Sequence, residues 1–496
     1  MIIGLSDTAF EYRGTIQDII WLFYPGAELV AGPKGEFFLH LSLRQEGQLL
    51  WAETQLYSNG AAMAHREEGL PILPGETPKE LKRLARMAVY RILESFSGRQ
   101  PTPWGIMTGI RPTKVVHRLL DLGWHSKEIL SYLVEKYALR QDKAALITDI
   151  AETQRPFMLS REQAGRLVSI YIGIPFCPTR CLYCSFPSYS IKHHRSMVEP
   201  FFNALLEEIR VVGETLQAHG LTAQTIYLGG GTPTSLNLEQ LETLLSAVNT
   251  YLRNDHTNEV TVEGGRPDTL KEEVLASLAA HGVTRLSINP QTMNQKTLDA
   301  IGRAHTVEDV YGAVERARKF RFATVNMDVI IGLPGETVAD VTRTVDSLLQ
   351  LKPENITVHA LALKRASHLK QRLAKFPLSD AGEAAAMWEE TARGTRTLGL
   401  VPYYMYRQKQ MVGNLENIGY ALPGRPCIYN IQMIEERQTI IGLGVGASSK
   451  WVDPRTWNLI NEYNAKEPRQ YVERLGEYLK RKVSHINHLS TIDDNL

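Results

Sequence analysis

Three of the four cysteines in the chain lie in one short stretch, GIPFCPTRCLYCSF, at residues 173–186. Cys177, Cys181 and Cys184 are spaced C-x3-C-x2-C, and soft thiolates at this spacing can each reach a different corner iron of one compact iron–sulfur cluster. Three thiolates leave one iron of a four-iron cluster without a protein ligand. Because an open metal position is typical of catalytic rather than structural sites, the loop predicts a catalytic cluster.

The same stretch could also bind a different metal group or act as a redox cysteine pair. A structural zinc ion could take the three thiolates together with His193 or His194, which follow the loop. Ferredoxin-type runs fit poorly, because they begin C-x2-C-x2-C and supply four cysteines. A redox cysteine pair needs a thioredoxin-like setting, which is absent. The fourth cysteine, Cys427, lies far along the chain, and we expect it to be a buried, inert thiol.

The elements around the cysteine loop predict a parallel barrel. From residue 169 onward, short apolar strands alternate with helices, and the strands read SIYIGIPF, TIYLGGG, EVTVEGG, RLSINPQ, TVNMDVIIGLP and NITVHALAL. Such alternation is typical of a parallel sheet or barrel. Each strand ends in glycine, proline or polar residues, at the edge where barrel enzymes keep their chemistry. We therefore expect the α/β class, with a partial (β/α)6 barrel over residues 166–375.

The remaining sequence divides into three further parts, as the length of 496 residues leads one to expect. Residues 1–100 predict an α+β unit, because strand-like runs are followed by an amphipathic helix. Residues 101–165 predict a helical connector. Residues 376–496 predict a mostly helical domain on the substrate side of the barrel, in which the GLGVGASS stretch is expected to form a loop.

Composition narrows the possible partners and location. Lys and Arg number 55 against 54 Asp and Glu, a formal net charge of +1, so neither nucleic acid nor a membrane surface is the expected main partner. No apolar run approaches the length of a membrane span. The N-terminal MIIGLSDTAF lacks the basic start of a signal peptide. We expect a cytoplasmic protein, in which clustered cysteines bind metal rather than form disulfides.

The cysteine loop at the end of the first barrel strand resembles the radical S-adenosylmethionine (SAM) superfamily. The motifs YIGIPFCPTRCLYCSF, YLGGGTPT, VEGGRPD, RLSINPQ, GRAHT and MDVIIGLPGET arrive in the order seen in oxygen-independent coproporphyrinogen III oxidases (coproporphyrinogen dehydrogenases) and their relatives. The long N-terminal extension is most similar to the HemZ branch. The resemblance implies a [4Fe–4S] cluster whose open iron is chelated by SAM, and a 5′-deoxyadenosyl radical released by one electron from the cluster.

The resemblance also implies a set of SAM contacts beside the cysteine ligands. Glycines at a strand end allow close backbone approach, a carboxylate suits a cationic cofactor, and an arginine fork can hold two carboxylate oxygens. Without the resemblance, each position has an ordinary structural alternative as a turn, an ion pair, a surface charge or barrel packing. The positions that match are Tyr171, Tyr183, Gly231, Thr232, Glu263, Gln291, Arg303 and Asp328.

The implied reaction is oxidative decarboxylation of coproporphyrinogen III propionates to vinyl groups, which gives protoporphyrinogen IX for haem biosynthesis. The implied partners are this tetrapyrrole and an electron donor such as flavodoxin or ferredoxin. Three positions depart from the best-characterised oxidases. Phe186 stands where they add a cysteine, Gly173 where they have histidine, and Asn289-Pro290 where Gly-Val precedes the matching glutamine.

A haem-binding chaperone of the HemW type is an alternative. Phe186 is the residue type found in those chaperones, which bind haem rather than make its precursor. They carry a His-Asn pair just after a C-terminal cysteine, whereas here Cys427 is followed by Ile428, Tyr429 and Asn430. The expected iron ligand is thus replaced by tyrosine, which can itself ligate haem iron. Another radical SAM reaction on a tetrapyrrole, such as methyl transfer, also stays open.

Overall fold

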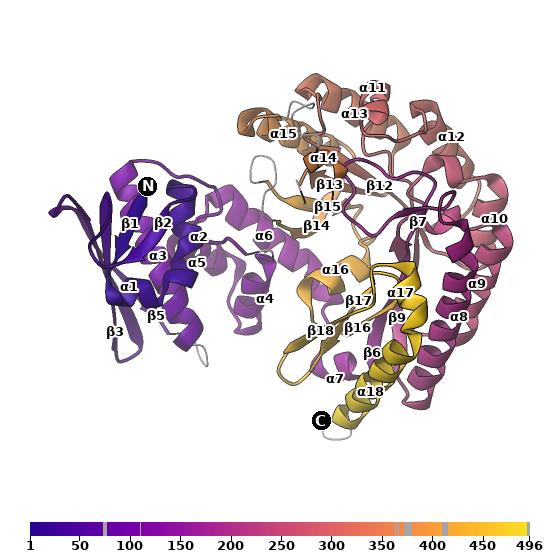
Figure 1. Cartoon of the computed structure of the whole chain (residues 1–496), viewed down its shortest axis with the longest axis horizontal. Coiled ribbons are helices and arrows are strands. Elements are labelled where there is room, and N and C mark those ends of the chain that lie inside the picture. The colour runs from indigo at the N-terminus through magenta and orange to yellow at the C-terminus, as the bar shows by residue number, and fades with distance from the viewer. Residues whose placement is uncertain are drawn as a thin grey trace. The chain divides into compact units, whose positions relative to one another are not determined.

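The computed structural model describes residues 1–72, 77–109, 111–362, 364, 367–371, 379–408 and 415–493. The chain divides into two compact units, unit 1 (Met1–Ala151) and unit 2 (Glu152–Leu496), which are drawn in Figure 1. The boundary between them falls inside the range 101–165, for which the sequence predicts a connector. None of the helices in the described ranges is both long enough and apolar enough to cross a membrane.

Unit 1 is built on a five-stranded sheet in the order β2-β1-β3-β4-β5. The strand β1 runs parallel to its neighbours β2 and β3, whereas β3, β4 and β5 form an antiparallel meander. Alternate residues of β4 are buried, as one covered face of a sheet requires. The bounds are β1 (Ile2–Leu5), α1 (Asp7–Glu11), α2 (Arg13–Phe23), β2 (Glu28–Ala31), β3 (Phe37–Glu46), β4 (Leu49–Ser58), β5 (Ala61–Pro71), α3 (Thr77–Ser97), α4 (Thr113–Asp121), α5 (Ser126–Tyr137) and α6 (Gln141–Gln154).

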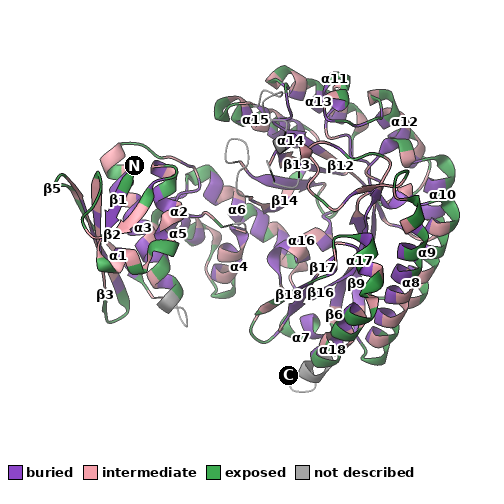
Figure 2. Ribbon diagram, viewed as in Figure 1, coloured by how far each residue is buried: buried purple, intermediate pink, exposed green. Residues whose placement is uncertain are grey.

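Unit 2 contains the predicted barrel. Six parallel strands lie side by side in the order β13-β12-β11-β10-β9-β6, and helices follow them in sequence (Figure 1). These strands are apolar and buried along most of their length, as strands covered on both faces must be (Figure 2). The predicted partial (β/α)6 barrel is therefore confirmed.

The elements of the barrel follow one another with short connections. Their bounds are α7 (Arg161–Arg166), β6 (Leu167–Ile174), β7 (Phe176–Cys177), β8 (Tyr189–Ser190), α8 (Arg195–Ala218), β9 (Thr222–Gly230), α9 (Leu238–Tyr251), β10 (Glu259–Glu263), α10 (Glu272–Ala280), β11 (Arg285–Ser287), α11 (Gln295–Ala300), α12 (Val307–Arg318), β12 (Thr324–Ile331), α13 (Val338–Leu351) and β13 (Asn355–Ala360).

The C-terminal region adds strands to both ends of this sheet. Strand β15 pairs antiparallel with β13 and is followed by β14, while β16 pairs parallel with β6 and is followed by β17 and β18. The helical prediction for residues 376–496 did not anticipate these strands. The bounds are α14 (His368–Gln371), α15 (Ala381–Thr397), β14 (Val401–Tyr406), β15 (Asn417–Ala421), α16 (Ile428–Glu435), β16 (Ile440–Gly444), β17 (Ser448–Val452), β18 (Leu459–Tyr463), α17 (Pro468–Glu473) and α18 (Leu475–Asp493).

The glycines of the GLGVG stretch serve close strand packing in this sheet. A Cβ atom on Gly444 would lie 2.3 Å from the carbonyl oxygen of Gly173 in β6, and one on Gly442 would lie 2.8 Å from the backbone of Ser448. Glycine is therefore required because the backbones approach each other. The expectation of a loop over residues 442–449 was wrong for 442–444, which belong to the buried strand β16, and for 448–449, which begin β17.

A buried polar cluster fixes the C-terminal helix α18 to the barrel. Glu208 of α8 accepts hydrogen bonds from the Gly444 amide at 2.7 Å, the Tyr471 hydroxyl at 2.6 Å and the Asn464 side chain at 3.1 Å. The ammonium of Lys482 in α18 lies 3.0 Å from the same carboxylate, and both side chains are almost fully buried. Every charged atom of this pair thus has a partner, as a buried ion pair requires.

Candidate functional site

A cavity of about 310 Å³ lies at the carboxyl ends of the barrel strands. Its wall comes from the cysteine loop, from the ends of the barrel strands, and from β14 and β15. The structure brings every residue of the predicted site together around this one cavity. They are Tyr171, Cys177, Cys181, Tyr183, Cys184, Gly231, Thr232, Glu263, Gln291, Arg303 and Asp328.

The cysteine loop is closed at its base by the short strands β7 and β8, which pair in parallel. Each of its three thiols accepts a hydrogen bond from a different donor, and two of these donors lie outside the loop. Hydrogen bonds to the sulfur ligands are one of the means by which a protein sets the reduction potential of an iron–sulfur cluster. The pairs are Thr232 Oγ1 to Cys177 Sγ at 3.4 Å, Arg303 Nη1 to Cys181 Sγ at 3.8 Å, and Ser188 Oγ to Cys184 Sγ at 3.8 Å.

The thiols of Cys177 and Cys184 are held in the protonated form when no metal is present. Burial raises the pKa of Cys177 to about 11 and raises that of Cys184 as well. Iron binding would therefore release protons from this loop, because the ligand form is the thiolate.

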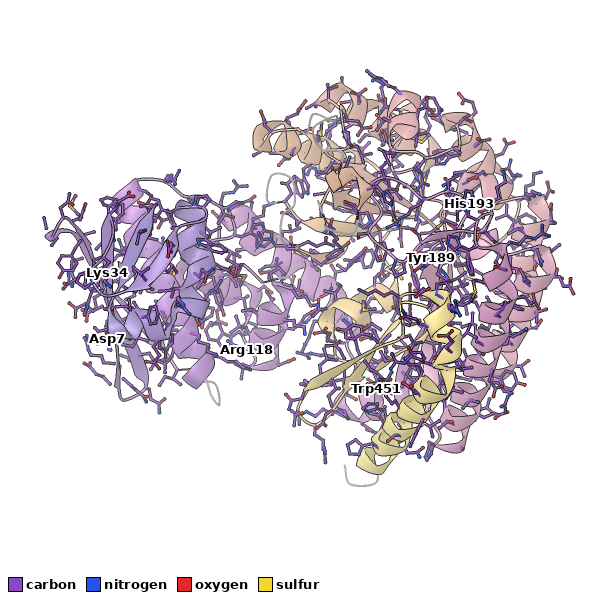
Figure 3. The ribbon with its side chains drawn as sticks, in the orientation of Figure 1. Asp7, Lys34, Arg118, Tyr189, His193 and Trp451 are labelled. Atoms are coloured by element: carbon purple, nitrogen blue, oxygen red, sulfur yellow. The ribbon has the colours of Figure 1, made fainter. Side chains whose placement is uncertain are left out.

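The zinc alternative finds little support in this geometry. Over the described ranges, no three His, Cys, Asp or Glu side chains gather closely enough to hold one metal ion. Tyr189 and His193, labelled in Figure 3, follow the cysteine loop. The ring of His194 packs against Tyr189, and its Nδ1 lies 3.1 Å from the Ser190 carbonyl oxygen. One cluster spreads its thiolates over several irons, so it does not require them to meet at a single point.

Arg303 is buried and connects the cysteine loop to the barrel. One terminal nitrogen donates to the sulfur of Cys181 and to the Tyr183 hydroxyl, and the other donates to the carbonyl oxygens of Gly265 and Asn289. The guanidinium fork, expected to hold a carboxylate of the cofactor, is thus engaged within the chain. Its Nε is buried and has no partner among the residues that the structure describes. The geometry therefore gives Arg303 a role in holding the loop.

Glu263 places a half-buried carboxylate at the end of β10. Its Oε1 accepts a hydrogen bond of 2.5 Å from the Tyr227 hydroxyl, and a Cβ atom on Gly229 would lie only 2.9 Å from its other oxygen. Burial raises the pKa of Glu263 to about 7, and the nearby carboxylate of Asp328 acts in the same direction. A cationic ligand beside Glu263 would favour the ionised form.

Gln291 and Asp328 lie next to each other on the same wall. Gln291 has a φ of +67°, which is unusual for a residue with a side chain, and it is held there by backbone hydrogen bonds to the Asp328 oxygen and the Ile330 amide. Burial raises the pKa of the Asp328 carboxyl, but the interaction with His359 and hydrogen bonds from Asn326 and other side chains outweigh it, so the net pKa is lowered. Asp328 is therefore ionised.

The sequence reasoning missed several residues of this wall. His359 of β13 and Tyr406 of β14 both line the cavity. His359 is a polar residue in the otherwise apolar strand NITVHA, which is a signal that could have identified it. Tyr406 comes from a strand that was not anticipated, so no comparable signal was available.

A stack of three tyrosines fills the barrel below the cavity. The ring of Tyr429 lies 4.5 Å from that of Tyr227 and 6.1 Å from that of Tyr171. The hydroxyl of Tyr429 is buried and has no hydrogen-bond partner in the described parts of the chain, and burial raises its pKa well above the ordinary value. The ring is thus enclosed in protein, and its hydroxyl stays protonated.

Cys427 lies outside the cysteine loop, as expected. It is buried, and its thiol donates to Glu259 Oε1 at 3.2 Å. The same carboxylate accepts the amides of Ile428 and Tyr429 at the start of α16. Glu259 therefore fixes the helix start that positions Tyr429, and the prediction of a buried thiol is confirmed.

A partial parallel barrel with three cysteines after its first strand defines the radical SAM class of proteins. The family model for the radical SAM superfamily matches residues 171–348. The oxygen-independent coproporphyrinogen-III oxidase-like protein HemZ of Bacillus subtilis is 38% identical over 478 residues, which are 96% of this chain and 95% of that protein. The chain therefore belongs to the radical SAM superfamily and, within it, to the family of HemZ and its relatives.

Two further proteins share this similarity. The heme chaperone HemW of B. subtilis is 32% identical over 295 residues, which cover 59% of this chain and 73% of that protein. The solved structure of coproporphyrinogen III oxidase (HemN) from Escherichia coli matches with a TM-score of 0.51 at 23% identity, covering 64% of this chain and 72% of that one. The match to HemN supports the fold, and oxidase-like and chaperone relatives both belong to the wider family.

The superfamily uses a [4Fe–4S] cluster together with SAM, and the residues of the cavity fit this pair. Three thiols, each with its own hydrogen-bond donor, suit a cluster. The half-buried carboxylate of Glu263, which has no ion-pair partner in the described ranges, suits the positive charge of SAM.

Proposed function

We propose that the chain catalyses the oxygen-independent oxidative decarboxylation of coproporphyrinogen III, converting propionate side chains to vinyl groups. The match to HemZ along nearly the whole chain supports an oxidase-like role. The gathering of all predicted cluster and SAM positions around one cavity supports radical chemistry there. Cys177, Cys181 and Cys184 would hold the cluster, and Glu263 would bind the cationic part of SAM.

One observation carries this proposal against the haem-chaperone alternative. Tyr429 occupies the position that corresponds to the chaperones' histidine, and a tyrosine ligates haem iron as the exposed phenolate. Here its ring is buried against the rings of Tyr227 and Tyr171, and its pKa is raised by burial. It would have to leave the stack and lose its proton before it could bind iron.

The residues of the chain would position the reaction and shield it. When bound, SAM and the cluster supply the radical that abstracts a hydrogen atom from a propionate, after which carbon dioxide and one further electron leave. Tyr171, which lines the cavity, packs against Tyr227 and Tyr429, and these rings would help to exclude water from the reacting groups. The electron needed to start the reaction would come from a donor of the flavodoxin or ferredoxin class.

The test is anaerobic incubation of the reconstituted protein with SAM, a chemical reductant and coproporphyrinogen III. The expected products are vinyl-bearing porphyrinogens and 5′-deoxyadenosine in matched amounts, which liquid chromatography with mass spectrometry measures. A Cys181→Ala variant, which lacks one thiol of the loop, serves as the inactive control.

Two other outcomes would contradict the proposal. Tight haem binding by the wild-type protein without turnover would favour the chaperone, and its loss in Tyr429→Phe would identify the ligand. Formation of 5′-deoxyadenosine with a methylated tetrapyrrole product would favour a different radical SAM reaction.

A further inference from the structure

One wall of the cavity carries a chain of three polar side chains, of which only Asp328 belongs to the expected cofactor contacts. His359 at the end of β13 lies between Asp328 of β12 and Tyr406 of β14. Its Nδ1 lies 3.3 Å from the Tyr406 hydroxyl, and its Nε2 lies 3.9 Å from Asp328 Oδ2. All three residues line the cavity.

The contact between His359 Nδ1 and the Tyr406 hydroxyl is a hydrogen bond, whereas the 3.9 Å between His359 Nε2 and Asp328 Oδ2 makes that contact an electrostatic one. The ionised Asp328 can only accept, so it favours a proton on Nε2 of His359. In neutral imidazole Nδ1 is then an acceptor that receives the Tyr406 proton. When His359 is protonated on both nitrogens, Nδ1 donates to the tyrosine oxygen instead. This frees the Tyr406 O–H to donate toward the cavity.

Cationic and anionic side chains both line the cavity, and two of the cations are engaged within the chain: Arg266 pairs with Asp268, and Arg303 donates to the carbonyl oxygens of Gly265 and Asn289. Four cationic side chains line the cavity, and two carboxylates, Asp328 and Glu263, face them. Lys364 comes from the connection after β13, close in sequence to His359, and does not belong to the expected cofactor contacts. The cationic side chains are Arg180, Arg266, Arg303 and Lys364.

We propose that Tyr406, held in place by His359, donates a hydrogen bond to a carboxylate of the substrate. His359 is a positioning residue, because it acts through the tyrosine. The inference rests on the proposed function, since it names the group that recognises a propionate of the tetrapyrrole. The inference places the substrate against β13 and β14. Asp328 is the one predicted cofactor contact on this wall.

The test compares two porphyrins that differ only in their carboxylates. Binding of coproporphyrin III and of its methyl ester to the reconstituted protein with SAM is measured by anaerobic fluorescence titration in one detergent solution. Tyr406→Phe should weaken binding of the acid about tenfold or more, because a hydrogen bond to a charged group is lost, and should leave ester binding unchanged. His359→Gln should weaken acid binding in the same direction.

Tyr404→Phe is the matched control on the same strand, because Tyr404 is buried and does not line the cavity. It should bind both porphyrins as the wild type does. If the wild type binds neither porphyrin, the proposed function fails. If the wild type binds the acid and Tyr406→Phe binds it equally well, or loses the acid and the ester alike, the proposed function stands and this inference is overturned.

Discussion

The two units of the chain each contain a cavity, and the residues able to do chemistry gather at the cavity of unit 2. The cavity of unit 1 has a volume of about 480 Å³ and lies beside β3 and β4, where Phe37, Phe38 and Tyr57 line it together with His40. The cavity of unit 2 has about 310 Å³, and three thiols, four cations and two carboxylates line it.

The difference follows from strand direction. In the antiparallel meander of unit 1, successive strands end at opposite edges, so polar residues at their ends are separated. In the parallel barrel of unit 2, every strand ends at the same edge, and residues far apart in sequence meet there. The convergence of strand ends is therefore what marks the site.

The largest expected effect tests whether the cysteine loop of unit 2 holds the cluster. Cys181→Ala removes a thiol that no other cysteine of the loop can replace, so we expect loss of the cluster and of SAM cleavage. Iron and sulfide analysis and the visible absorption spectrum of the reconstituted protein measure this.

Cys427→Ala is the matched control for that experiment. Its thiol bonds to Glu259 and lies outside the cavity lining, so the iron content should equal that of the wild type. If Cys427→Ala lost the cluster as Cys181→Ala does, the assignment of the three ligands would be wrong.

The second prediction concerns the buried ion pairs, which also differ between the units. In unit 1, Glu80 of α3 pairs with Arg83 of the same helix and with Arg118 of α4, whereas in unit 2 Glu208 of α8 pairs with Lys482 of α18. Lys482→Met leaves the Glu208 carboxylate buried without its cation, and we expect a loss of about 3–5 kcal/mol in the free energy of unfolding. Hydrogen exchange with mass spectrometry should show α18 and β16 losing protection while β3 and β4 keep theirs.

Arg83→Met provides the reverse case, with protection lost in α3 and retained in α18. Arg469→Met, which breaks an exposed pair with Glu473, should change little. Loss of protection in both units from either buried variant would contradict the idea that each unit has its own core.

Local patterns made the barrel predictable, and contacts between distant segments made the rest unpredictable. The six barrel strands are apolar runs bounded by glycine and proline, and they appear in the structure as expected. Strand β16 was missed because its glycines, which are typical of loops, serve the close approach to Gly173. The ion pair between Glu208 and Lys482 joins residues far apart in sequence, and the sequence around neither residue indicates that it is buried.

The residues of the site likewise divide into those that the sequence predicts and those that it does not. The cysteine spacing and the strand-end residues predict one half of the cavity, because each motif sits directly after a barrel strand. The roles of these residues as ligands stay predictions. The other half depends on Tyr406. Its strand β14 pairs with β15, which in turn pairs with the barrel strand β13. Which side chains face His359 follows from that pairing, and only the folded chain reveals it.

The third prediction uses the raised pKa of Glu263. Below about pH 7 its carboxyl is mainly protonated and neutral, and above this pH it is mainly ionised. The affinity for the SAM cation should therefore rise as the pH is raised through this value, by up to about tenfold per unit on the acid side. Equilibrium dialysis of labelled SAM with the reconstituted protein measures it, and Glu263→Gln should flatten the dependence.

Glu336→Gln is the matched control for the pH dependence. Burial raises the pKa of Glu336 to about 7 as well, but this carboxylate bonds to Thr292 and Asn294 and does not line the cavity. Its variant should keep the pH dependence of the wild type. An unchanged pH profile in Glu263→Gln would remove the carboxylate from the proposed SAM contacts.

The smallest expected effect concerns the hydrogen bonds to the thiols. Ser188→Ala removes the donor to Cys184 while the cysteine remains, so the cluster should form with a lower midpoint potential, by an amount on the order of tens of millivolts. Ser235→Ala is the control, because its hydroxyl bonds to the Phe176 carbonyl oxygen and to no thiol. Titration monitored by electron paramagnetic resonance measures both. Equal potentials in Ser188→Ala and the wild type would mean that this hydroxyl does not donate to Cys184 once iron is bound. The hydrogen bond would then have no part in setting the potential of the cluster.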